Sequence, residues 1–300
     1  VFNMIHGQHE AVNFICDAPE LKAISFVGSN VAGEHIYKRA TPLGKRVQSN
    51  MGAKNHIVVM PDADKNEAMS ALIGSAFGAA GQRCMANSVA VFVGDAADWV
   101  PEFVERSAAV KVNEGMVEGA ELGPVISVEQ RERVERIIAN ARVEGAEVPL
   151  DGSGIVVEGF ENGNFVGPTV ITGVTPEMEC YQEEIFAPVL TCCNVDTLDD
   201  AIEFINKNQY GNGTAIMTRS GAVAQKFQWE IEAGQIGINV PIPVGLSYLG
   251  FTGKKKSFMG ERHFYGMDGV HFYTNLKTII QKWNYEPAEF EAQFTFPVQN

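Results

Sequence analysis

Short apolar runs that resemble buried strands alternate along this chain with stretches whose apolar residues follow a helical period. The helix-like stretches are about 10–15 residues long, which suits a crossover between two parallel strands. Such crossovers place helices on the faces of a sheet. The alternation therefore predicts an α/β fold with a layer of parallel strands.

The same pattern assigns elements to residue ranges. Helices are predicted over 10–17, 30–39, 64–77, 97–109, 128–143, 199–207 and 221–232. Strands are predicted over 23–27, 56–60, 88–93, 165–171, 188–195, 213–218 and 235–239. Residues 270–282 differ, because they are rich in β-branched and aromatic types and no helix pattern follows them. We expect an edge strand there that pairs with another subunit, and a loose acidic tail from Glu286.

The chain is acidic, with 23 Lys and Arg against 37 Asp and Glu and a formal net charge of −14. A nucleic-acid-binding surface needs a basic face, so this composition excludes a general nucleic-acid binder. An apolar fraction of 45% is enough for a large core. No apolar run approaches the roughly 18–20 residues that would span a bilayer, so no membrane partner is expected.

Five cysteines are too few and too unevenly spaced for a disulfide framework, and the six histidines show no metal spacing. We expect a reducing compartment, no metal site, and histidines on the surface or satisfied in the core. Cys192 and Cys193 are adjacent in one apolar run, so we expect them on the inner and outer faces of one strand. The chain starts at Val1 without a signal or transit pattern, and we expect it to be the C-terminal part of a longer protein.

Cys84 is the best candidate for a nucleophile. It follows a run of small residues at 74–81, where backbone can approach a ligand closely. Arg83 beside it supplies positive charge that favours the thiolate, the reactive form. The alternative is a lone cysteine that acts as a small buried hydrophobe. The local sequence leaves both interpretations open.

Several strings in the chain, taken together, resemble the aldehyde dehydrogenase superfamily. In the family's order they are FVGS at 26–29, NMGAKNH at 50–56, GQRCMA at 81–86, EEIFAPV at 183–189, YGNGT at 210–214 and FYTNLKT at 272–278. The resemblance runs over about residues 1–283, and its specific match is to the CoA-acylating methylmalonate-semialdehyde dehydrogenase branch.

This resemblance implies an aldehyde dehydrogenase-like α/β fold in four parts. Residues 1–50 would complete a dinucleotide-binding domain, and 51–255 would form the catalytic domain. Residues 256–283 would form a return segment and an oligomerisation strand, and 284–300 a tail. It also implies that the earlier strands of the cofactor domain, and an Asn side chain that serves the oxyanion, lie upstream of this chain.

The resemblance assigns chemistry to Cys84 and Arg83. Cys84 would add to an aldehyde and keep the acyl group as a thioester after hydride passes to NAD, with its own backbone N–H serving the oxyanion. Arg83 would bind the carboxylate of a semialdehyde, since a guanidinium fork matches carboxylate geometry.

Five residues would bind NAD by the same resemblance. Gly28 and Ser29 end a strand and open a helix, so they would meet the pyrophosphate. Met51 would reach the nicotinamide amide with its backbone. Glu184 would hold the nicotinamide ribose hydroxyls, and Phe186 would lie beside the nicotinamide ring.

Asn50 separates this chain from most hydrolytic members of the superfamily. Those members have Glu 34 positions before the nucleophile, where it deprotonates the water that releases the acid. An amide has no basic lone pair at neutral pH and does not do that work. The acylating branch shares this Asn and passes the acyl group to coenzyme A, a partly ionised thiol that needs a base less than water does. The alternative is that Asn50 is only a turn residue at a strand end.

The implied reaction converts methylmalonate or malonate semialdehyde, CoA and NAD to propionyl-CoA or acetyl-CoA, CO2 and NADH, in valine and pyrimidine catabolism. The implied partners are these small molecules and further copies of the chain, as a dimer or tetramer. The location would be mitochondrial in a eukaryote, which we favour, or cytoplasmic in a bacterium. Three other interpretations stay open: a catalytically silent fragment that only pairs through its terminal strand, a Cys84 hydrolase of esters or thioesters that needs no NAD, and a related dehydrogenase with another substrate.

Overall fold

The computed structural model of the chain describes residues 2–283, and its strands form three sheets. The strands are β1 (Ala23–Val27), β2 (Arg46–Asn50), β3 (Asn55–Val59), β4 (Asn87–Val93), β5 (Glu147–Leu150), β6 (Thr169–Thr172), β7 (Val189–Val195), β8 (Tyr210–Gly211), β9 (Gly213–Met217), β10 (Gln235–Ile238), β11 (Lys254–Lys255) and β12 (Phe258–Met259). The largest sheet has seven strands in the order β10-β9-β3-β4-β7-β6-β5. Its pairs are parallel except for β5 with β6, which confirms the predicted α/β architecture.

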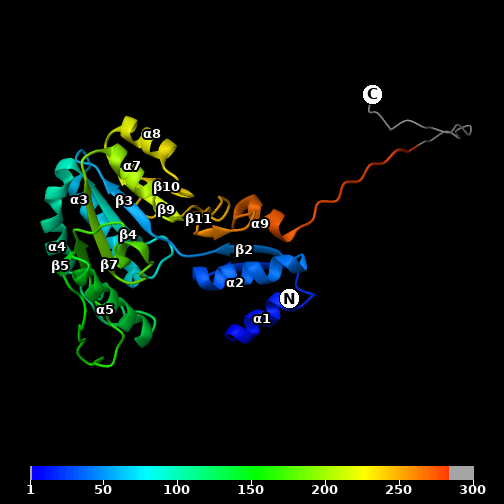
Figure 1. The fold of residues 1–300 in the computed structure, drawn as a ribbon, viewed down its shortest axis with the longest axis horizontal. Coiled ribbons are helices and arrows are strands. Elements are labelled where there is room, and N and C mark those ends of the chain that lie inside the picture. Colours follow the sequence, from blue (N-terminus) through cyan, green and yellow to red (C-terminus); the bar gives the residue numbers. More distant parts are fainter. Residues whose placement is uncertain (1, 284–300) are drawn as a thin grey trace, which may run out of the picture.

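The helices cover this sheet and a smaller one. They are α1 (His9–Asp17), α2 (Asn30–Ala40), α3 (Lys65–Phe77), α4 (Val100–Ala108), α5 (Val128–Val143), α6 (Glu179–Gln182), α7 (Leu198–Asn206), α8 (Gly221–Glu230) and α9 (Gly266–Tyr273). Figure 1 shows α3, α4, α5, α7 and α8 around the large sheet, and α1 and α2 beside β2.

Capping side chains set where several of these helices begin. An oxygen of Ser29, Asp64, Ser127, Thr197 or Ser220 accepts a hydrogen bond from a backbone N–H in the first turn of α2, α3, α5, α7 or α8. These starts confirm the corresponding sequence predictions to within two residues. The helix predicted over 97–109 divides at Val100 into a 3-10 turn and α4, with Pro101 in the first turn of the latter.

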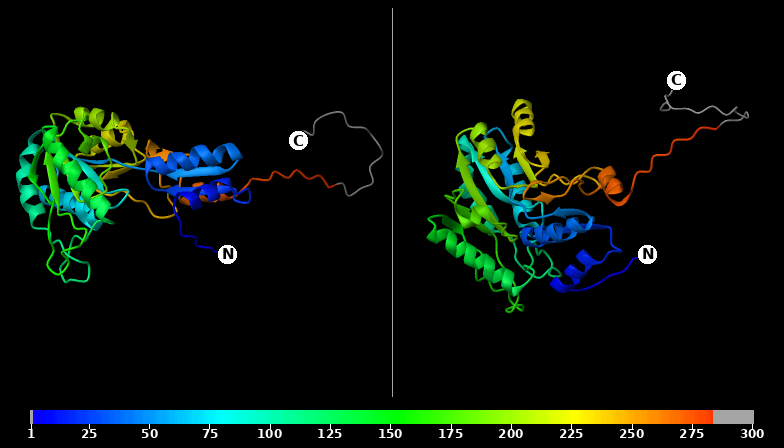
Figure 2. Two further views of the ribbon diagram at one scale, coloured as in Figure 1. Left: turned by 60° about the horizontal axis from the view of Figure 1, so that its bottom comes forward. Right: turned by 45° about the vertical axis from the view of Figure 1, so that its right-hand side comes forward.

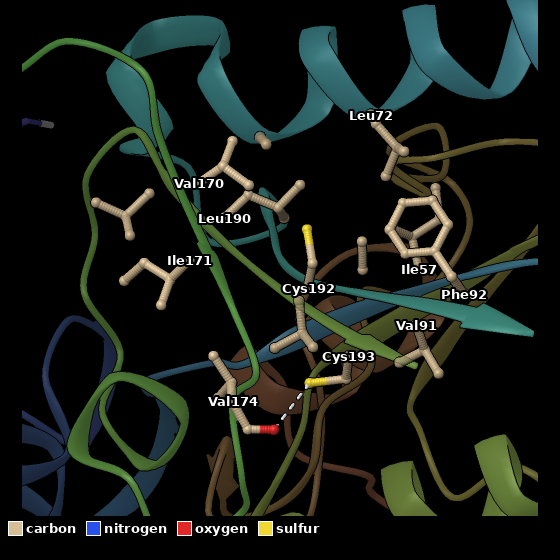
Figure 3. Packing of buried hydrophobic residues seen from close by; sticks show 14 of the residues in the cluster. Ile57, Leu72, Val91, Phe92, Val170, Ile171, Val174, Leu190, Cys192 and Cys193 are labelled. Carbon is tan, nitrogen blue, oxygen red and sulfur yellow. Dashed lines mark hydrogen bonds between the residues drawn. The ribbon is translucent and has the colours of Figure 1, made fainter. Parts of the chain in front are cut away.

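The centre of the large sheet is buried on both faces. Successive side chains of a strand point to opposite faces, and every residue from Val89 to Val93 is 3% exposed or less. Figure 3 shows Val91, Phe92 and the cysteines of β7 packed in this core. Cys192 and Cys193 are both buried, and the Cys193 thiol lies 3.8 Å from the Val174 carbonyl oxygen. The prediction that one of the pair faces outward is therefore wrong, because helices cover both faces of β7.

The smaller sheet has the order β1-β2-β12, and the sequence did not predict its central strand. Residues 46–50 read RVQSN, with one large apolar side chain, so no strand pattern is visible. The segment is nevertheless paired on both sides, parallel to β1 and antiparallel to β12, with Asn50 opposite both Val27 and Phe258. Phe258 and Met259 thus pair with a sheet whose other two strands, β1 and β2, lie more than 200 residues earlier in the chain.

The edge strand predicted over 270–282 is wrong in its first part. Residues 266–273 form α9, which buries Phe272, and the Arg46 guanidinium donates hydrogen bonds to the carbonyls of His271, Phe272 and Thr274 at its end. These contacts override the β-branched and aromatic composition. Residues 274–283 form no strand within this chain and lead away from the body, as Figure 2 shows. The predicted acidic tail lies outside the described residues.

Two further features of the described residues bear on function. No helix in the range 2–283 is long and apolar enough to cross a bilayer. The same range holds no group of three or more His, Cys, Asp and Glu side chains placed to bind a metal ion.

Candidate active site

The loop that carries Cys84 has an unusual backbone. Ala79, Ala80 and Gly81 all have positive φ, at 52°, 53° and 66°. A non-glycine residue in this region costs about 1–3 kcal/mol, and such strain concentrates at functional sites. Gly81 has a second constraint, because a Cβ there would overlap the carbonyl oxygen of Ala187. The loop therefore packs closely against residues 183–189.

A narrow pocket lies where these two segments meet. Its lining includes Ala53, Arg83, Cys84, Glu184 and Phe186. The structure thus brings together four residues that the sequence analysis assigned to one site from separate parts of the chain. Phe186 also has a positive φ of 56°, so both walls of the pocket contain strained backbone.

The Cys84 thiol is partly exposed, whereas the other four cysteines are buried. Burial is the main cause that raises the pKa of the Cys84 thiol, and the Glu184 carboxylate raises it further. The backbone N–H groups of Cys84 and Met85 act in the opposite direction. At neutral pH more of the Cys84 side chain is therefore in the thiol form than in the thiolate form.

The structure places the Arg83 guanidinium next to Gly78, and its expected effect on the Cys84 thiolate stays a prediction. Its exposed side chain folds back, so a Cβ on Gly78 would lie 2.6–3.0 Å from the guanidinium. Within residues 2–283 the guanidinium also forms no salt bridge, which leaves it available to an anionic ligand.

The segment that carries Glu184 and Phe186 is held through its backbone carbonyls. Lys54 Nζ donates to the Glu183 carbonyl at 2.8 Å and to the Cys180 carbonyl at 2.7 Å. From α5, the Arg133 guanidinium donates to the carbonyl of Glu184 at 3.0 Å and to that of Ile185 at 3.1 Å.

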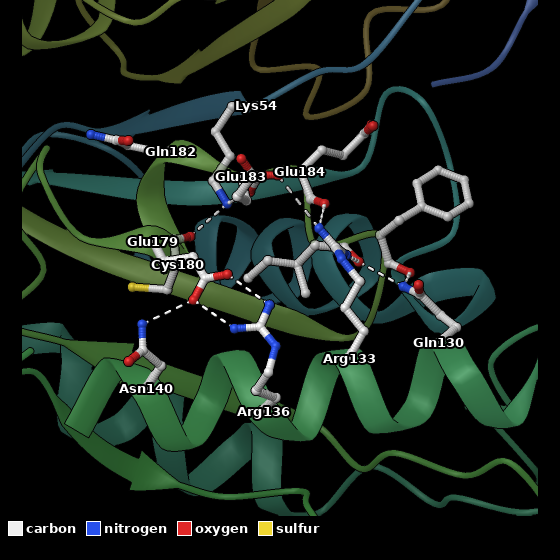
Figure 4. Close-up of polar contacts among 12 residues, drawn as sticks. Lys54, Gln130, Arg133, Arg136, Asn140, Glu179, Cys180, Gln182, Glu183 and Glu184 are labelled. Atoms are coloured by element: carbon white, nitrogen blue, oxygen red, sulfur yellow. Dashed lines mark hydrogen bonds and ion pairs between the residues drawn. The ribbon is translucent and has the colours of Figure 1, made fainter. Parts of the chain in front are cut away.

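Gln130, one turn before Arg133, also holds this segment through its backbone carbonyls. Its side-chain amide donates to the carbonyls of Ile185 at 2.7 Å and Phe186 at 3.2 Å, as Figure 4 shows. The sequence analysis missed Gln130, Arg133 and Lys54. The only signal for Gln130 and Arg133 was their i, i+3 spacing on one face of a predicted helix, and Lys54 stood in the string NMGAKNH without an assigned role.

The carboxyl group of Glu184 has a raised pKa. Burial raises the pKa of its carboxyl to about 7, against the lowering effects of the Ala53 N–H, Lys54 and Arg133. Burial likewise lowers the pKa of Lys54 to about 8. Gly52 lies against this carboxyl, since a Cβ on Gly52 would be 3.0 Å from Glu184 Oε2.

Gly28, Ser29 and Met51 lie together at the carboxyl ends of β1 and β2, where α/β proteins bind ligands. The Gly28 N–H donates to the Asn50 carbonyl at 3.1 Å, and the Ser29 hydroxyl caps α2 by accepting from Ala32 N at 3.4 Å. These two groups already have partners within the chain. The Met51 side chain packs directly on Gly33 of α2, where a Cβ would lie 2.6 Å from it.

Asn50 ends β2 and is 2% exposed, so it is a strand residue with a buried side chain. Its Oδ1 has no hydrogen-bond donor among the described residues, and neither has Asn212 Oδ1. Both oxygens lie 3.4 Å from the point that a Cβ on Gly253 would occupy. The structure therefore places Asn50 beside Asn212, which in turn contacts the Cys84 backbone.

Comparisons with known proteins give a consistent result. The family model described as "Aldehyde dehydrogenase family" matches residues 1–279. The chain is 58% identical over 290 residues to a rat protein named methylmalonate-semialdehyde/malonate-semialdehyde dehydrogenase [acylating], mitochondrial, covering 97% of this chain and 54% of that protein.

Solved structures agree. A methylmalonate-semialdehyde dehydrogenase from Oceanimonas doudoroffii superposes with a TM-score of 0.91 at 46% identity, covering 93% of this chain and 58% of that chain. A Sinorhizobium meliloti protein complexed with NAD gives a TM-score of 0.91 at 40% identity, covering 93% and 57%. The chain therefore spans about half the length of the relatives that it matches.

Proposed function

The chain belongs to the aldehyde dehydrogenase family, and from that premise we propose that it oxidises methylmalonate or malonate semialdehyde with NAD and transfers the acyl group to coenzyme A. The products are propionyl-CoA or acetyl-CoA, CO2 and NADH. The observation that carries this proposal is the pairing of a strained, partly exposed Cys84 loop with a buried amide, Asn50, where hydrolytic relatives have a base.

Cys84 acts as the nucleophile in this proposal. Its sulfur forms a bond to the aldehyde carbon, and the oxygen becomes an oxyanion that the Cys84 N–H stabilises. Loss of hydride from that carbon leaves a thioester on Cys84. The β-carboxylate of this thioester then leaves as CO2, and the electron pair of the broken bond forms an enolate that takes a proton from water, which gives the propionyl or acetyl thioester. The thiolate of CoA then attacks the carbonyl carbon, and the Cys84 thiolate leaves.

Arg83 is the proposed ligand of the substrate carboxylate. Arg83 lines the pocket with an exposed side chain, and its guanidinium forms no salt bridge within the described range. A bidentate guanidinium–carboxylate pair fixes orientation as well as charge, so it selects semialdehydes over neutral aldehydes.

Glu184, Phe186, Met51, Gly28 and Ser29 are the proposed NAD-binding residues. Bound NAD supplies the hydride acceptor. The buried Glu184 carboxyl suits vicinal hydroxyls, and Gly52 leaves the space in front of it that a Cβ would fill. The NAD-complexed relative of known structure supports the same cofactor.

Asn50 accounts for the choice of coenzyme A over water. Its amide cannot take a proton from water at neutral pH, so hydrolysis of the thioester gains no general base there. The thiol of CoA is already a few per cent ionised near pH 7 and is intrinsically nucleophilic. Transfer to CoA is therefore the favoured exit for the acyl group.

We extend the proposal to assembly and location. Residues 274–283 carry strongly exposed apolar side chains, among them Leu276 and Ile280, which are 91% and 87% exposed. Pairing of this segment with a second copy would cover them and give a homo-oligomer. The names of the mitochondrial relatives support a mitochondrial location.

The experiment that tests the function incubates the chain with methylmalonate semialdehyde, NAD and CoA, and quantifies NADH and propionyl-CoA. We expect both products in equal amounts and neither with Cys84→Ser. NADH formation with free acid as the main product would overturn the acyl transfer. Hydrolysis of p-nitrophenyl esters without any NADH would instead identify a hydrolase, and no turnover by a folded chain would identify a silent fragment.

A further inference from the structure

The carbonyl oxygen of Cys84 accepts hydrogen bonds from two buried side-chain amides. Asn55 Nδ2 lies 2.9 Å from it and Asn212 Nδ2 lies 3.1 Å from it. Asn55 opens β3 and Asn212 lies between β8 and β9, so two strands of the sheet region converge on one peptide. Both side chains are 2% exposed or less.

Each amide is anchored by a second contact. Asn55 Nδ2 also donates to the Ala86 carbonyl at 2.9 Å, and Asn55 Oδ1 accepts from the Gly213 N–H at 3.0 Å. Asn212 Nδ2 lies 3.1 Å from the sulfur of Met85, which is itself 2% exposed. The peptide that joins Cys84 to Met85 is thus fixed at its oxygen and at the following side chain.

The orientation of this peptide determines where its N–H points. A trans peptide is planar, with the C=O and the N–H on opposite sides. Because Asn55 and Asn212 hold the Cys84 oxygen, the Met85 N–H points away from both. The Met85 N–H is one of the two backbone groups that act on the Cys84 thiol to favour its ionised form.

We propose that Asn55 and Asn212 are positioning residues that hold the Cys84–Met85 peptide so that its N–H faces the Cys84 sulfur and stabilises the thiolate. This inference rests on the proposed role of Cys84 as the nucleophile. It adds to that role a source of thiolate stabilisation built from two side chains that lie in the quoted strings NMGAKNH and YGNGT but received no role from the resemblance.

Stabilisation of the thiolate by backbone N–H groups matters at this site, because a neighbouring charge acts against the thiolate. The Glu184 carboxylate opposes ionisation, and the Arg83 guanidinium lies over Gly78. The groups that favour the thiolate are the backbone N–H groups of Cys84 and Met85. A change in the direction of the Met85 N–H therefore alters the reactivity of Cys84 without any change of side-chain charge.

The test is the pH profile of alkylation of the 300-residue chain by iodoacetamide. Four of the five cysteines are buried, so Cys84 dominates the signal, and Cys84→Ser provides the blank. Asn212→Leu keeps the volume of the side chain but loses both N–H donors. In this variant we expect the midpoint of the profile, the pH at which the alkylation rate is half its maximum, to rise by about half to one pH unit. Alkylation at pH 7 then slows by about three- to tenfold.

Asn208→Ala is the matched control, because Asn208 is also buried, lies four positions before Asn212 and bonds the Tyr210 N–H instead of Cys84. Its midpoint should equal that of the parent chain. Asn212→Ser serves where Asn212→Leu does not fold, as judged by circular dichroism. An unchanged midpoint in a folded Asn212 variant, or a rate lowered equally at every pH, would overturn the inference. Since iodoacetamide needs no aldehyde, NAD or CoA, a shifted midpoint in a chain that forms no acyl-CoA would refute the proposed function alone.

Discussion

In the proposed function, the side chain of Asn50 decides whether the acyl group passes to CoA or to water. Its amide is buried at the end of β2, beside a second amide oxygen, and neither oxygen has a donor among the residues described. A carboxylate in the same place would lie in low dielectric among acceptors, which raises its pKa toward neutrality and makes it a better base.

We therefore expect Asn50→Glu to raise the ratio of free acid to CoA ester by about tenfold or more, because a general base then serves water. The measurement is chromatographic quantification of both products at fixed CoA. Asn50→Gln, which restores no base, is the matched control. Equal product ratios in the Glu and Gln variants would contradict the role given to Asn50.

Glu184 predicts a pH dependence of cofactor binding. Its pKa of about 7 means that the carboxylate, the form that accepts hydrogen bonds from ribose hydroxyls, is mostly lost between pH 8 and pH 6. We expect the NAD dissociation constant to rise by about tenfold over that interval. Calorimetric titration measures it.

Glu184→Gln separates this effect from that of Lys54, whose pKa of about 8 lies in the same window. The variant should bind NAD more weakly at pH 8 and show a flatter pH profile, with the Lys54 contribution remaining. Parallel profiles for the parent chain and the variant would show that Glu184 does not contact the cofactor.

At the scale of elements, the conformation of the loop that carries Cys84 requires glycine at position 81. Gly81 and Gly173 share a φ of 66°, but a Cβ meets the Ala187 carbonyl only at Gly81 and open space at Gly173. Gly173→Ala should destabilise by about 1 kcal/mol through the left-handed backbone alone. Gly81→Ala should destabilise by at least about 2 kcal/mol and slow Cys84 alkylation. Urea unfolding of both variants measures the difference, and equal losses would contradict the close approach.

Elements with local signals were predictable from the sequence, and elements stabilised by distant contacts were not. A capping Ser, Thr or Asp and a regular apolar period located α3, α5 and α7. The strand β2 escaped notice because three of its four buried residues, Gln48, Ser49 and Asn50, are polar. Helix α9 was mistaken for a strand because Arg46, more than 220 residues away, caps its end.

The candidate site divides in the same way. The motif residues Cys84, Glu184 and Phe186 were expected together and line one pocket. The direction of the Arg83 side chain depends on how its loop packs. The hydrogen bonds from Gln130 and Arg133 to the carbonyls of residues 184–186 depend on how that segment packs against α5. A single sequence does not reveal this packing. The position of Asn212 beside Cys84 is likewise a product of strand order.

At the scale of the whole molecule, the buried histidine of β3 predicts how stability changes with acid. His56 is 2% exposed, and its Nε2 lies 3.1 Å from the Tyr181 hydroxyl, so it is a satisfied core histidine as expected. Burial lowers its pKa to about 3. Between pH 6.5 and 3 the unfolded chain binds a proton that the folded chain does not, so this group makes stability fall with decreasing pH.

The expected loss from His56 is at most about 1.4 kcal/mol per pH unit below its unfolded pKa. In His56→Phe the unfolding free energy, measured with urea from pH 7 to 5, should depend less on pH by that amount. His271, which is half-buried on α9, provides the control as His271→Phe. An identical pH slope in His56→Phe and the parent chain would contradict a neutral, buried His56.

The central claim is that Cys84 holds an acyl group that CoA removes and water does not. The most direct measurement acylates the chain with p-nitrophenyl propionate, which needs no NAD, and follows the propionyl mass on the Cys84 peptide with time. The account predicts that the adduct persists in buffer and disappears rapidly on addition of CoA, with propionyl-CoA as the product. Discharge at the same rate with and without CoA would contradict it.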